Sequence, residues 1–138
     1  MKRILVTGGA GFIGSAFVRF QLAEYPDTHI VTFDKMTYAG NLDNLKEADP
    51  ARHSFVQGDI ADPDAIGEAM EGCDAVVNFA AETHVDRSIL GASEFLRTNV
   101  DGVYNLVESA KRLGTARVLL VSTDEVYGSI DDGSFKES

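Results

Sequence analysis

The sequence predicts an α/β fold in which helices cover both faces of one doubly wound parallel sheet. Short runs rich in β-branched residues alternate with longer segments of helical period, and no linker, repeat or low-complexity tract interrupts them. Several of the short runs are apolar on both faces, which is typical of strands inside a covered sheet. The repeated order of strand, helix and strand implies right-handed crossovers, and we expect the strand order 3-2-1-4-5.

Length and composition favour one globular domain. Of the 138 residues, 44% are hydrophobic and 25% are charged. Twelve Lys and Arg residues stand against 22 Asp and Glu residues, and the formal net charge of -10 argues against nonspecific binding to nucleic acid or to an anionic membrane. Cys73 is the single cysteine, which excludes an internal disulfide, and no stretch reaches membrane-spanning length. We therefore expect a cytoplasmic protein with no nucleic-acid or membrane partner.

The expected elements follow one another in a regular order. Five strands are predicted, at residues 4–7, 30–33, 54–57, 75–79 and 117–122. The first helix spans 12–24 and ends before Pro26, because the residue that precedes proline is disfavoured in the α region. Asp62 and Pro63 are of the types preferred at an N-cap and at the first helical position, so a short helix begins there and runs towards Met70.

A longer amphipathic helix is predicted between the fourth and fifth strands. Apolar residues recur there at steps of three and four, namely Leu96, Val100, Val103, Val107 and Ala110. Gly114 stands where a C-cap glycine belongs, so we expect the helix to end just before it.

The first strand runs into a glycine-rich turn, T-G-G-A-G-F-I-G. Gly8, Gly11 and Gly14 are three residues apart, and glycine lets such a turn bend sharply, approach a pyrophosphate and pack close to the following helix. The helix that begins near Phe12 directs unpaired N–H groups and its positive dipole end at the phosphates. The pattern indicates a Rossmann-like dinucleotide-binding domain, with a purely structural turn as the alternative.

An acidic residue stands at the end of the second strand. Asp34 lies twenty residues beyond Gly14, where a carboxylate accepts hydrogen bonds from the adenosine ribose hydroxyls. A carboxylate there repels a 2′-phosphate, so NAD is favoured over NADP, although Lys35 directly after it complicates that choice. The alternative for Asp34 is a solvated turn residue.

Polar residues also follow the third and fourth strands. Asp59, in Gly58-Asp59-Ile60, would place a carboxylate near the adenine, and A-A-E-T-H-V-D-R-S follows the fourth strand. In open parallel sheets the ligand lies outside the carboxyl ends of the strands, so these residues are candidates as a group. No group of His, Cys and carboxylate residues has metal-ligand spacing, and no metal is predicted.

Six motifs, taken in order, resemble one known family. They are T-G-G-A-G-F-I-G-S, D-K-M-T-Y-A-G-N-L, G-D-I, F-A-A-E-T-H-V-D-R-S-I, T-N-V-D-G and V-S-T-D-E-V-Y-G. Together they closely resemble the dTDP-glucose 4,6-dehydratases of the extended short-chain dehydrogenase/reductases. Related epimerases usually carry small hydroxyl residues in place of Asp124 and Glu125, whereas decarboxylases and GDP-mannose dehydratases usually show S-T-S-E. The Asp-Glu pair therefore indicates glucose dehydration, while Ala16, Met36 and Thr83 depart from the commonest pattern.

The resemblance implies NAD as cofactor and a nucleotide sugar, dTDP-glucose, as substrate. The implied NAD contacts are Gly8, Gly11, Phe12, Ile13, Gly14, Asp34, Lys35, Met36, Thr37, Asp59, Ile60, Phe79, Ala80, Ala81, Glu82, Thr83 and Thr98. The implied sugar contacts are Thr83, His84, Arg87 and Thr123. For His84 a core or helix-capping role is an equal alternative, and Arg87 has an ion pair with Asp86 as its alternative. Tyr38 and Asn41 are implied to belong to the loop that closes over the adenosine.

The family reaction explains the acidic pair. It oxidises the C4 hydroxyl by hydride transfer to NAD, removes water across C5 and C6, and returns the hydride to C6. The resemblance assigns Asp124 as general acid, Glu125 as general base and Thr123 as a contact near the C4 oxygen. Two neighbouring carboxylates suit these roles because the elimination needs one acid and one base, and both reach one sugar only if the strand ends before them. The alternative is a pair of solvated loop acids.

The superfamily's catalytic Tyr-x-x-x-Lys does not occur in this sequence. Tyr25, Tyr38, Tyr104 and Tyr127 are followed four positions later by His29, Leu42, Glu108 and Asp131. We therefore interpret residues 1–138 as an incomplete NAD-binding domain, the N-terminal part of a longer enzyme, without its nucleotide-sugar lobe and without turnover of its own. The full enzyme is expected to be a homodimer, and the open edge of the fifth strand to favour association.

Three other functions remain open on the sequence. A UDP-glucose 4,6-dehydratase would carry the same acidic pair. A noncatalytic NAD-binding or regulatory module is favoured by the missing Tyr and Lys. An epimerase or decarboxylase of the same superfamily is the third.

Overall fold

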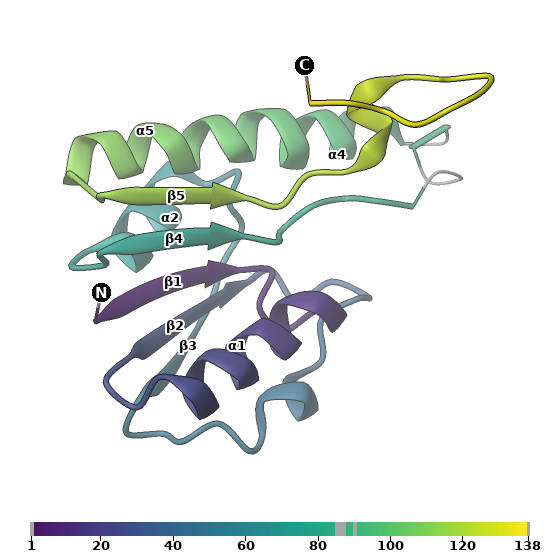
Figure 1. Cartoon of the computed structure of the whole chain (residues 1–138). Helices are drawn as coiled ribbons and strands as arrows, with labels where there is room; N and C mark the ends of the chain where they lie inside the picture. Colours follow the sequence, from purple (N-terminus) through teal and green to yellow (C-terminus); the bar gives the residue numbers. More distant parts are fainter. Residues whose placement is uncertain (1, 85–87, 90, 138) are drawn as a thin grey trace.

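The computed structural model describes residues 2–84, 88–89 and 91–137, which build a five-stranded sheet. The strands are β1 (Arg3–Thr7), β2 (His29–Asp34), β3 (His53–Gln57), β4 (Ala75–Asn78) and β5 (Arg117–Leu120). All neighbouring pairs are parallel, and the order β3-β2-β1-β4-β5 confirms the predicted order (Figure 1). The direction of winding reverses between β1 and β4, so a ligand crevice is expected at the carboxyl ends of these two strands.

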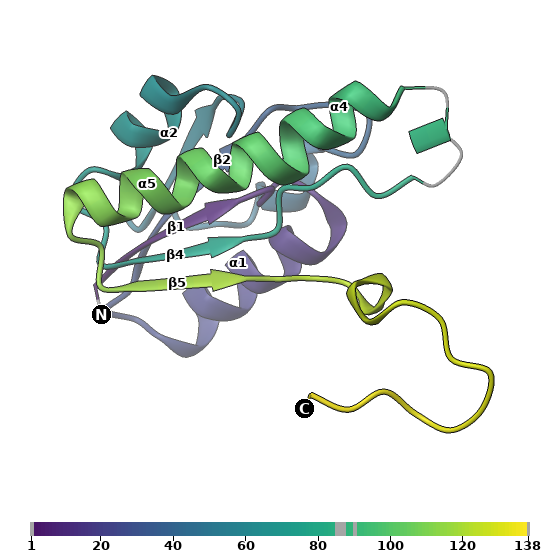
Figure 2. The same cartoon turned by 90° about the horizontal axis from the view of Figure 1, so that it is seen from above.

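Helices cover both faces of the sheet, as predicted. The helical elements are α1 (Phe12–Glu24), η1 (Leu42–Leu45), α2 (Pro63–Met70), α4 (Ala92–Leu96), η2 (Arg97–Gly102), α5 (Val103–Leu113) and η3 (Asp124–Tyr127). Helix α1 lies on one face, and α2 and α5 lie on the other (Figure 1 and Figure 2). The alternation of β1 shows the two layers: Ile4 and Val6 pack with Val18 of α1, whereas Leu5 packs in the second cluster with Leu106 of α5.

The predicted helix ends are confirmed where local chemistry sets them. Helix α1 ends at Glu24, before the Tyr25-Pro26 step. The Asp62 carboxylate caps α2 by accepting from the N–H groups of Asp64 and Ala65 at 3.0 and 3.1 Å, a type of contact worth about 1 kcal/mol. Gly114 follows α5 with a φ of +71°, the left-handed conformation of a C-cap glycine.

The helical segment after β4 departs from the predicted amphipathic pattern. It consists of α4, the π-helical segment η2 and α5. Leu96, Val100 and Val107 are 62%, 56% and 41% exposed, although their spacing suggested a core face. Ala110 is buried as predicted, but the rest of the buried side is formed by Thr98, Gly102, Leu106 and Ser109. A π-helical stretch widens the turn, so a period of 3.6 residues drawn across it does not mark one face.

Strand β5 forms an open edge of the sheet. Among the described residues it pairs only with β4, and all four residues of the strand are exposed. Leu119 is 56% exposed, so this strand contributes little to the core. The chain then continues past the end of β4 into η3, which puts the S-T-D-E stretch near the crevice expected at the strand ends (Figure 2).

Candidate active site

The turn after β1 brings the backbone close to the loop after β4. Gly8 has a φ of +66°, and a Cβ there would lie 2.6 Å from the backbone nitrogen of Ala80. The Gly8 N–H donates to the Phe33 carbonyl at 2.8 Å, which ties the turn to β2. Gly14 packs so closely on the Gly8 carbonyl that a side chain has no room. The glycines therefore do what the motif predicts, a sharp bend and a close approach of helix and strand.

The first turn of α1 faces outwards. Its N-cap is Gly11, so no cap side chain competes for the first N–H groups, which have no intrahelical partner. Phe12 and Ile13 are 89% and 62% exposed. The helix therefore offers its N–H groups and its positive dipole end to an anion next to Gly8.

Asp34 is held in position at the end of β2. Its side chain is nearly buried, Oδ2 accepts from the Ala10 N–H at 3.0 Å, and Oδ1 accepts from the Met36 N–H at 2.9 Å. Met36 has a φ of +59°, a left-handed conformation that turns the backbone over the carboxylate. Each carboxylate oxygen has a second lone pair, so Asp34 can still accept from a hydroxyl.

A first cleft joins most of the predicted cofactor contacts. It has an empty volume of about 580 Å³. The predicted cofactor contacts that line this cleft are Gly8, Gly11, Asp34, Lys35, Thr37, Asp59, Ile60, Phe79, Ala80, Ala81, Glu82 and Thr98. The structure does not place the other predicted contacts on its wall: Phe12, Ile13, Gly14, Met36 and Thr83. The prediction missed four lining residues: Ala39, Gly40 and Gly58, which lie inside two of the quoted motifs but were not singled out as contacts, and Phe33, which precedes Asp34 in β2.

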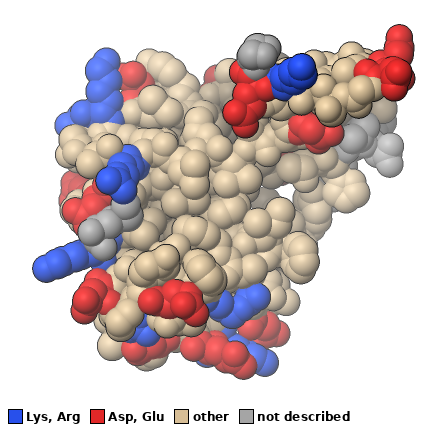
Figure 3. All heavy atoms as spheres, in the orientation of Figure 1, with Lys and Arg blue, Asp and Glu red and all other residues tan. Residues whose placement is uncertain are grey.

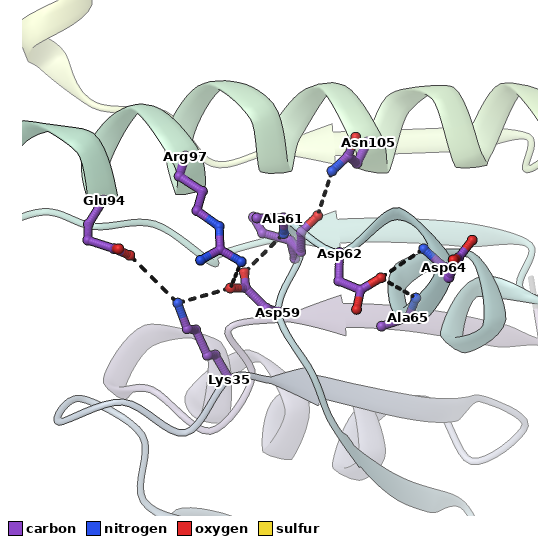
Figure 4. A network of polar contacts seen from close by, with 10 residues as sticks. Lys35, Asp59, Ala61, Asp62, Asp64, Ala65, Glu94, Arg97 and Asn105 are labelled. Carbon is purple, nitrogen blue, oxygen red and sulfur yellow. Dashed lines mark hydrogen bonds and ion pairs between the residues drawn. The ribbon is translucent and has the colours of Figure 1, made fainter.

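A network of charged side chains closes the β3 end of this cleft. Lys35 Nζ lies 2.9 Å from Asp59 Oδ2, and Arg97 Nη2 lies 3.3 Å from the same oxygen (Figure 4). The other oxygen of Asp59 accepts from the Ala61 N–H at 3.0 Å. Burial alone would raise the pKa of Asp59, but the Ala61 N–H and the two cations outweigh it and lower that pKa below its usual value.

A second cleft lies beside the first and reaches the end of β5. It has an empty volume of about 1270 Å³, and it shares Ala80, Ala81 and Glu82 with the first cleft. Thr83, Thr123 and Glu125 line it, which brings three predicted site residues together. Asp124 is not among the lining residues.

The acidic pair lies in the 3-10 turn η3, beyond the last residue of β5. The strand has therefore ended before the pair, as predicted. Thr123 is the N-cap of this turn: its Oγ1 accepts from the Glu125 N–H at 3.4 Å and donates to Asp124 Oδ1 at 3.5 Å. All three residues are exposed. Glu125 lines the second cleft, and Asp124 lies outside it.

The remaining predicted contacts are placed less closely. The His84 ring lies 6.0 Å from the Tyr38 ring, centroid to centroid, so it meets the loop after β2. Asn41 caps η1 by accepting from the Asp43 N–H at 2.9 Å. Arg87 lies outside the described residues.

Asn99 is a site residue that the pattern missed. Its amide oxygen accepts from the Glu82 N–H at 2.9 Å, and its amide nitrogen donates to the Glu82 carbonyl at 2.8 Å. It therefore pairs with the loop after β4 as a neighbouring strand would, and this loop forms the wall common to both clefts. The only signal in the sequence is the T-N-V-D-G motif, whose polar residues interrupt the apolar period.

Two other features bear on the chemistry of the molecule. Among the described residues, no group of three or more His, Cys, Asp or Glu side chains is arranged to hold a metal ion, and no helix is long and apolar enough to span a membrane. On the face shown in Figure 3, charged side chains of both signs lie mainly around the rim, and no continuous basic patch is visible.

Known proteins share much of this sequence. The sequence model of the family described as GDP-mannose 4,6 dehydratase matches residues 5–138. A dTDP-glucose 4,6-dehydratase of Streptomyces niveus is 52% identical over 140 residues, covering 98% of this chain and 42% of that protein. The low-salt glycan biosynthesis protein Agl12 of Haloferax volcanii is 52% identical over 135 residues, covering 97% of this chain and 43% of its own length.

Solved structures agree with this fold. DesIV, a dTDP-glucose 4,6-dehydratase of Streptomyces venezuelae crystallised with NAD and TYD bound, has a TM-score of 0.91 and 56% identity. The match covers 99% of this chain and 44% of DesIV. The chain thus spans less than half the length of the relatives that it matches.

Proposed function

This chain belongs to the GDP-mannose 4,6-dehydratase family, and on that premise we propose that it forms the NAD-binding, N-terminal portion of a cytoplasmic nucleotide-sugar 4,6-dehydratase. The reaction is the conversion of dTDP-glucose to dTDP-4-keto-6-deoxyglucose, a lyase reaction in which NAD is regenerated. The observation that carries the proposal is the continuity of the two clefts. The cofactor cleft and the cleft at the Asp-Glu pair share the wall formed by Ala80, Ala81 and Glu82.

The cofactor cleft fits a dinucleotide in three respects. Gly8, with a φ of +66°, bends the backbone sharply, lets the loop after β4 approach the glycine-rich turn, and lines the cleft itself. The first turn of α1 supplies N–H groups for the phosphates. Asp34 keeps acceptor capacity for ribose hydroxyls beside these groups. NAD bound here would accept a hydride from C4 of the sugar and return it to C6.

The residues of η3 supply the acid and the base of the elimination. Glu125, on the wall of the second cleft, removes the C5 proton, which the C4 ketone has made acidic. Asp124 donates a proton to the C6 hydroxyl, which then leaves as water. Thr123 contacts the C4 oxygen from the same turn. Glu125 lines the cleft that the sugar enters, whereas Asp124 is exposed beside it and must turn towards the sugar to donate its proton.

The proposal is tested with the full-length protein that contains this chain, incubated with dTDP-glucose in deuterated water. We expect the 4-keto-6-deoxy product with deuterium at C5. Asp124→Asn is expected to slow water loss while exchange at C5 persists, and Glu125→Gln is expected to abolish the exchange. Asp131→Asn, which removes an exposed carboxylate from the same segment, is the matched control and should change neither step. Elimination that is unchanged in both variants of the pair would overturn the assignment.

The same experiment separates the competing functions. A preference for UDP-glucose over dTDP-glucose would make the protein the UDP-sugar enzyme with the same acid and base. Interconversion of C4 epimers without loss of water would indicate an epimerase. Binding of NAD without any reaction would indicate a noncatalytic module.

We also propose that the full enzyme is a homodimer. The supporting observation is that four large apolar side chains of α4, η2 and α5, namely Leu96, Val100, Tyr104 and Val107, are 41% to 65% exposed. Exposed apolar surface of this kind is costly in water unless it is covered. The double variant Val100→Glu/Tyr104→Glu should halve the mass measured by sedimentation velocity; an unchanged mass would contradict the proposed interface.

A further inference from the structure

The choice between NAD and NADP depends on the contacts of Lys35. This residue directly follows Asp34 at the end of β2, where a cation is well placed to bind the 2′-phosphate of NADP. A free ammonium there would offset the repulsion that the Asp34 carboxylate exerts on the same phosphate. The structure shows where that ammonium goes.

Asp34 and Lys35 reach opposite sides of the sheet. The Asp34 carboxylate bonds to Ala10, in the turn before α1. The Lys35 side chain extends the other way, towards α4 and η2, where Nζ lies 2.9 Å from Asp59 Oδ2 and 3.8 Å from Glu94 Oε2 (Figure 4). This divergence is the ordinary alternation of neighbouring side chains along a strand.

The main partner of Lys35 is itself fixed. Asp59 has a side chain that is 16% exposed, and it is held by the Ala61 N–H and by Arg97. Lys35 and Arg97 carry two positive charges, and Asp59 and Glu94 carry two negative charges, so the formal charges of the network cancel. Movement of Lys35 towards a phosphate would break its contact with a partly buried carboxylate.

We propose that Asp59, assisted by Glu94, makes the site selective for NAD by holding Lys35 away from the 2′ position of the adenosine. This inference rests on the proposed dinucleotide site. With Lys35 engaged, the ribose meets the Asp34 carboxylate, which accepts from hydroxyls and repels a phosphate of charge about -1.5 to -2 at pH 7. Asp59 therefore controls selectivity at the 2′ position of the adenosine indirectly, because it holds the Lys35 ammonium away from that position.

The test is the ratio of the NADP and NAD dissociation constants, measured for this chain and its variants by NMR titration. The ratio cancels any loss that both coenzymes share, such as a lost adenine contact or a smaller folded fraction. Lys35→Met should change the ratio less than about threefold, because its ammonium is already engaged. Asp59→Asn should shift the ratio about tenfold towards NADP, the size of one new charge-assisted contact.

The double variant Lys35→Met/Asp59→Asn is the decisive control, and it should restore the parent ratio. Glu94→Gln should shift the ratio towards NADP by about twofold, because its contact is longer and more exposed. A tenfold change in Lys35→Met alone would overturn the inference, since Lys35 would then already serve the 2′-phosphate. A shift in Asp59→Asn that persists without Lys35 would also overturn it. If the parent chain binds neither coenzyme, the proposed dinucleotide site is wrong. If the chain binds NAD but the ratio of the dissociation constants is the same in all variants, only the proposed role of Asp59 is wrong.

Discussion

The two ends of the candidate site hold their carboxylates very differently. At the cofactor end, Asp34 is 9% exposed, and two backbone N–H groups donate to its oxygens at 2.9 and 3.0 Å. At the end of β5, Asp124 and Glu125 are exposed: the Asp124 carboxylate accepts from the Thr123 hydroxyl at 3.5 Å, and Glu125 contacts that hydroxyl only through its backbone N–H, at 3.4 Å. The first arrangement is rigid, and the second is at the limit of a hydrogen bond.

The position of each strand in the sheet explains this difference. Strand β2 lies between β1 and β3 and is covered on both faces, whereas β5 pairs with β4 alone. Folding of the described residues thus prearranges the cofactor cleft, and it leaves the acid-base pair without comparable support. We expect changes at the cofactor end to affect folding and binding together, and changes at η3 to affect chemistry alone.

The largest effect is expected at Gly8. Gly8→Ala places a methyl group 2.6 Å from the Ala80 backbone at a φ of +66°, so we expect a loss of about 3 kcal/mol in the free energy of unfolding and no detectable NAD binding. Gly72→Ala is the matched control, because Gly72 has a φ of +69° and no neighbouring atom within 4 Å. It should cost only about 1 kcal/mol. Urea unfolding measures both; equal losses would show that backbone conformation, not close approach, requires Gly8.

Asp34→Asn should have the next largest effect. It removes the charge that accepts from two N–H groups and, in the proposed site, from the ribose hydroxyls, so we expect NAD affinity to fall about tenfold to hundredfold and stability to fall by about 2 kcal/mol. Asp124→Asn should leave the stability of this chain within about 0.5 kcal/mol of the parent value, because its side chain is exposed. Calorimetry and urea unfolding test both. A similar loss of stability in the two variants would remove the contrast between the ends of the site.

A smaller effect is expected at Asn99. Asn99→Ala removes two hydrogen bonds to the Glu82 backbone, and the expected cost is about 1 to 2 kcal/mol in the free energy of unfolding. Asn105→Ala is the matched control, since its amide makes one longer hydrogen bond of 3.4 Å to the Ile60 carbonyl. If Asn105→Ala lowers the free energy of unfolding as much as Asn99→Ala does, the pairing with Glu82 has no special role in ordering the common wall of the clefts.

The smallest effect concerns pH. The pKa of Asp59 is lower in the folded chain than its usual value of 3.8, so the charged carboxylate adds stability that is fully present above about pH 5. This stability is lost as the pH falls through 4 and below, where the carboxylate binds a proton. Urea unfolding between pH 3 and pH 6 should therefore show a shallower decline in Asp59→Asn than in the parent chain. Identical profiles would mean that the network around Lys35 adds no net stability.

The sequence predicted the parts of the fold that depend on local pattern. The bend at Gly8 and the cap at Asp62 follow from short-range residue types, and both are confirmed. The strand order is also confirmed, but it was expected from the repeated order of strand, helix and strand along the whole chain. The apolar period after β4 was misleading, because the π-helical turn of η2 rotates Val100 to the surface. A hydrophobic period assumes a constant helical pitch, and η2 breaks that assumption.

The contacts that join distant segments were not predictable in the same way. Lys35 and Asp59 lie in the loops after β2 and β3, Arg97 lies in η2, and no spacing rule connects them. The sequence therefore left the role of Lys35 open, and only the fold shows its partners. The sequence likewise could not show that Asp124 lies outside the second cleft while its neighbour Glu125 lines it.

The most direct test of the account is hydrogen exchange of this chain with and without NAD. Because the described residues prearrange the cofactor cleft, NAD should slow amide exchange at residues 8–14, 34–37 and 58–60, even if binding is weak. Exchange at residues 122–128 should stay unchanged, since η3 is exposed and lies beyond that cleft. Protection confined to residues 122–128, or none at the glycine-rich turn at saturating NAD, would contradict the central claim that the cofactor end is formed within this chain.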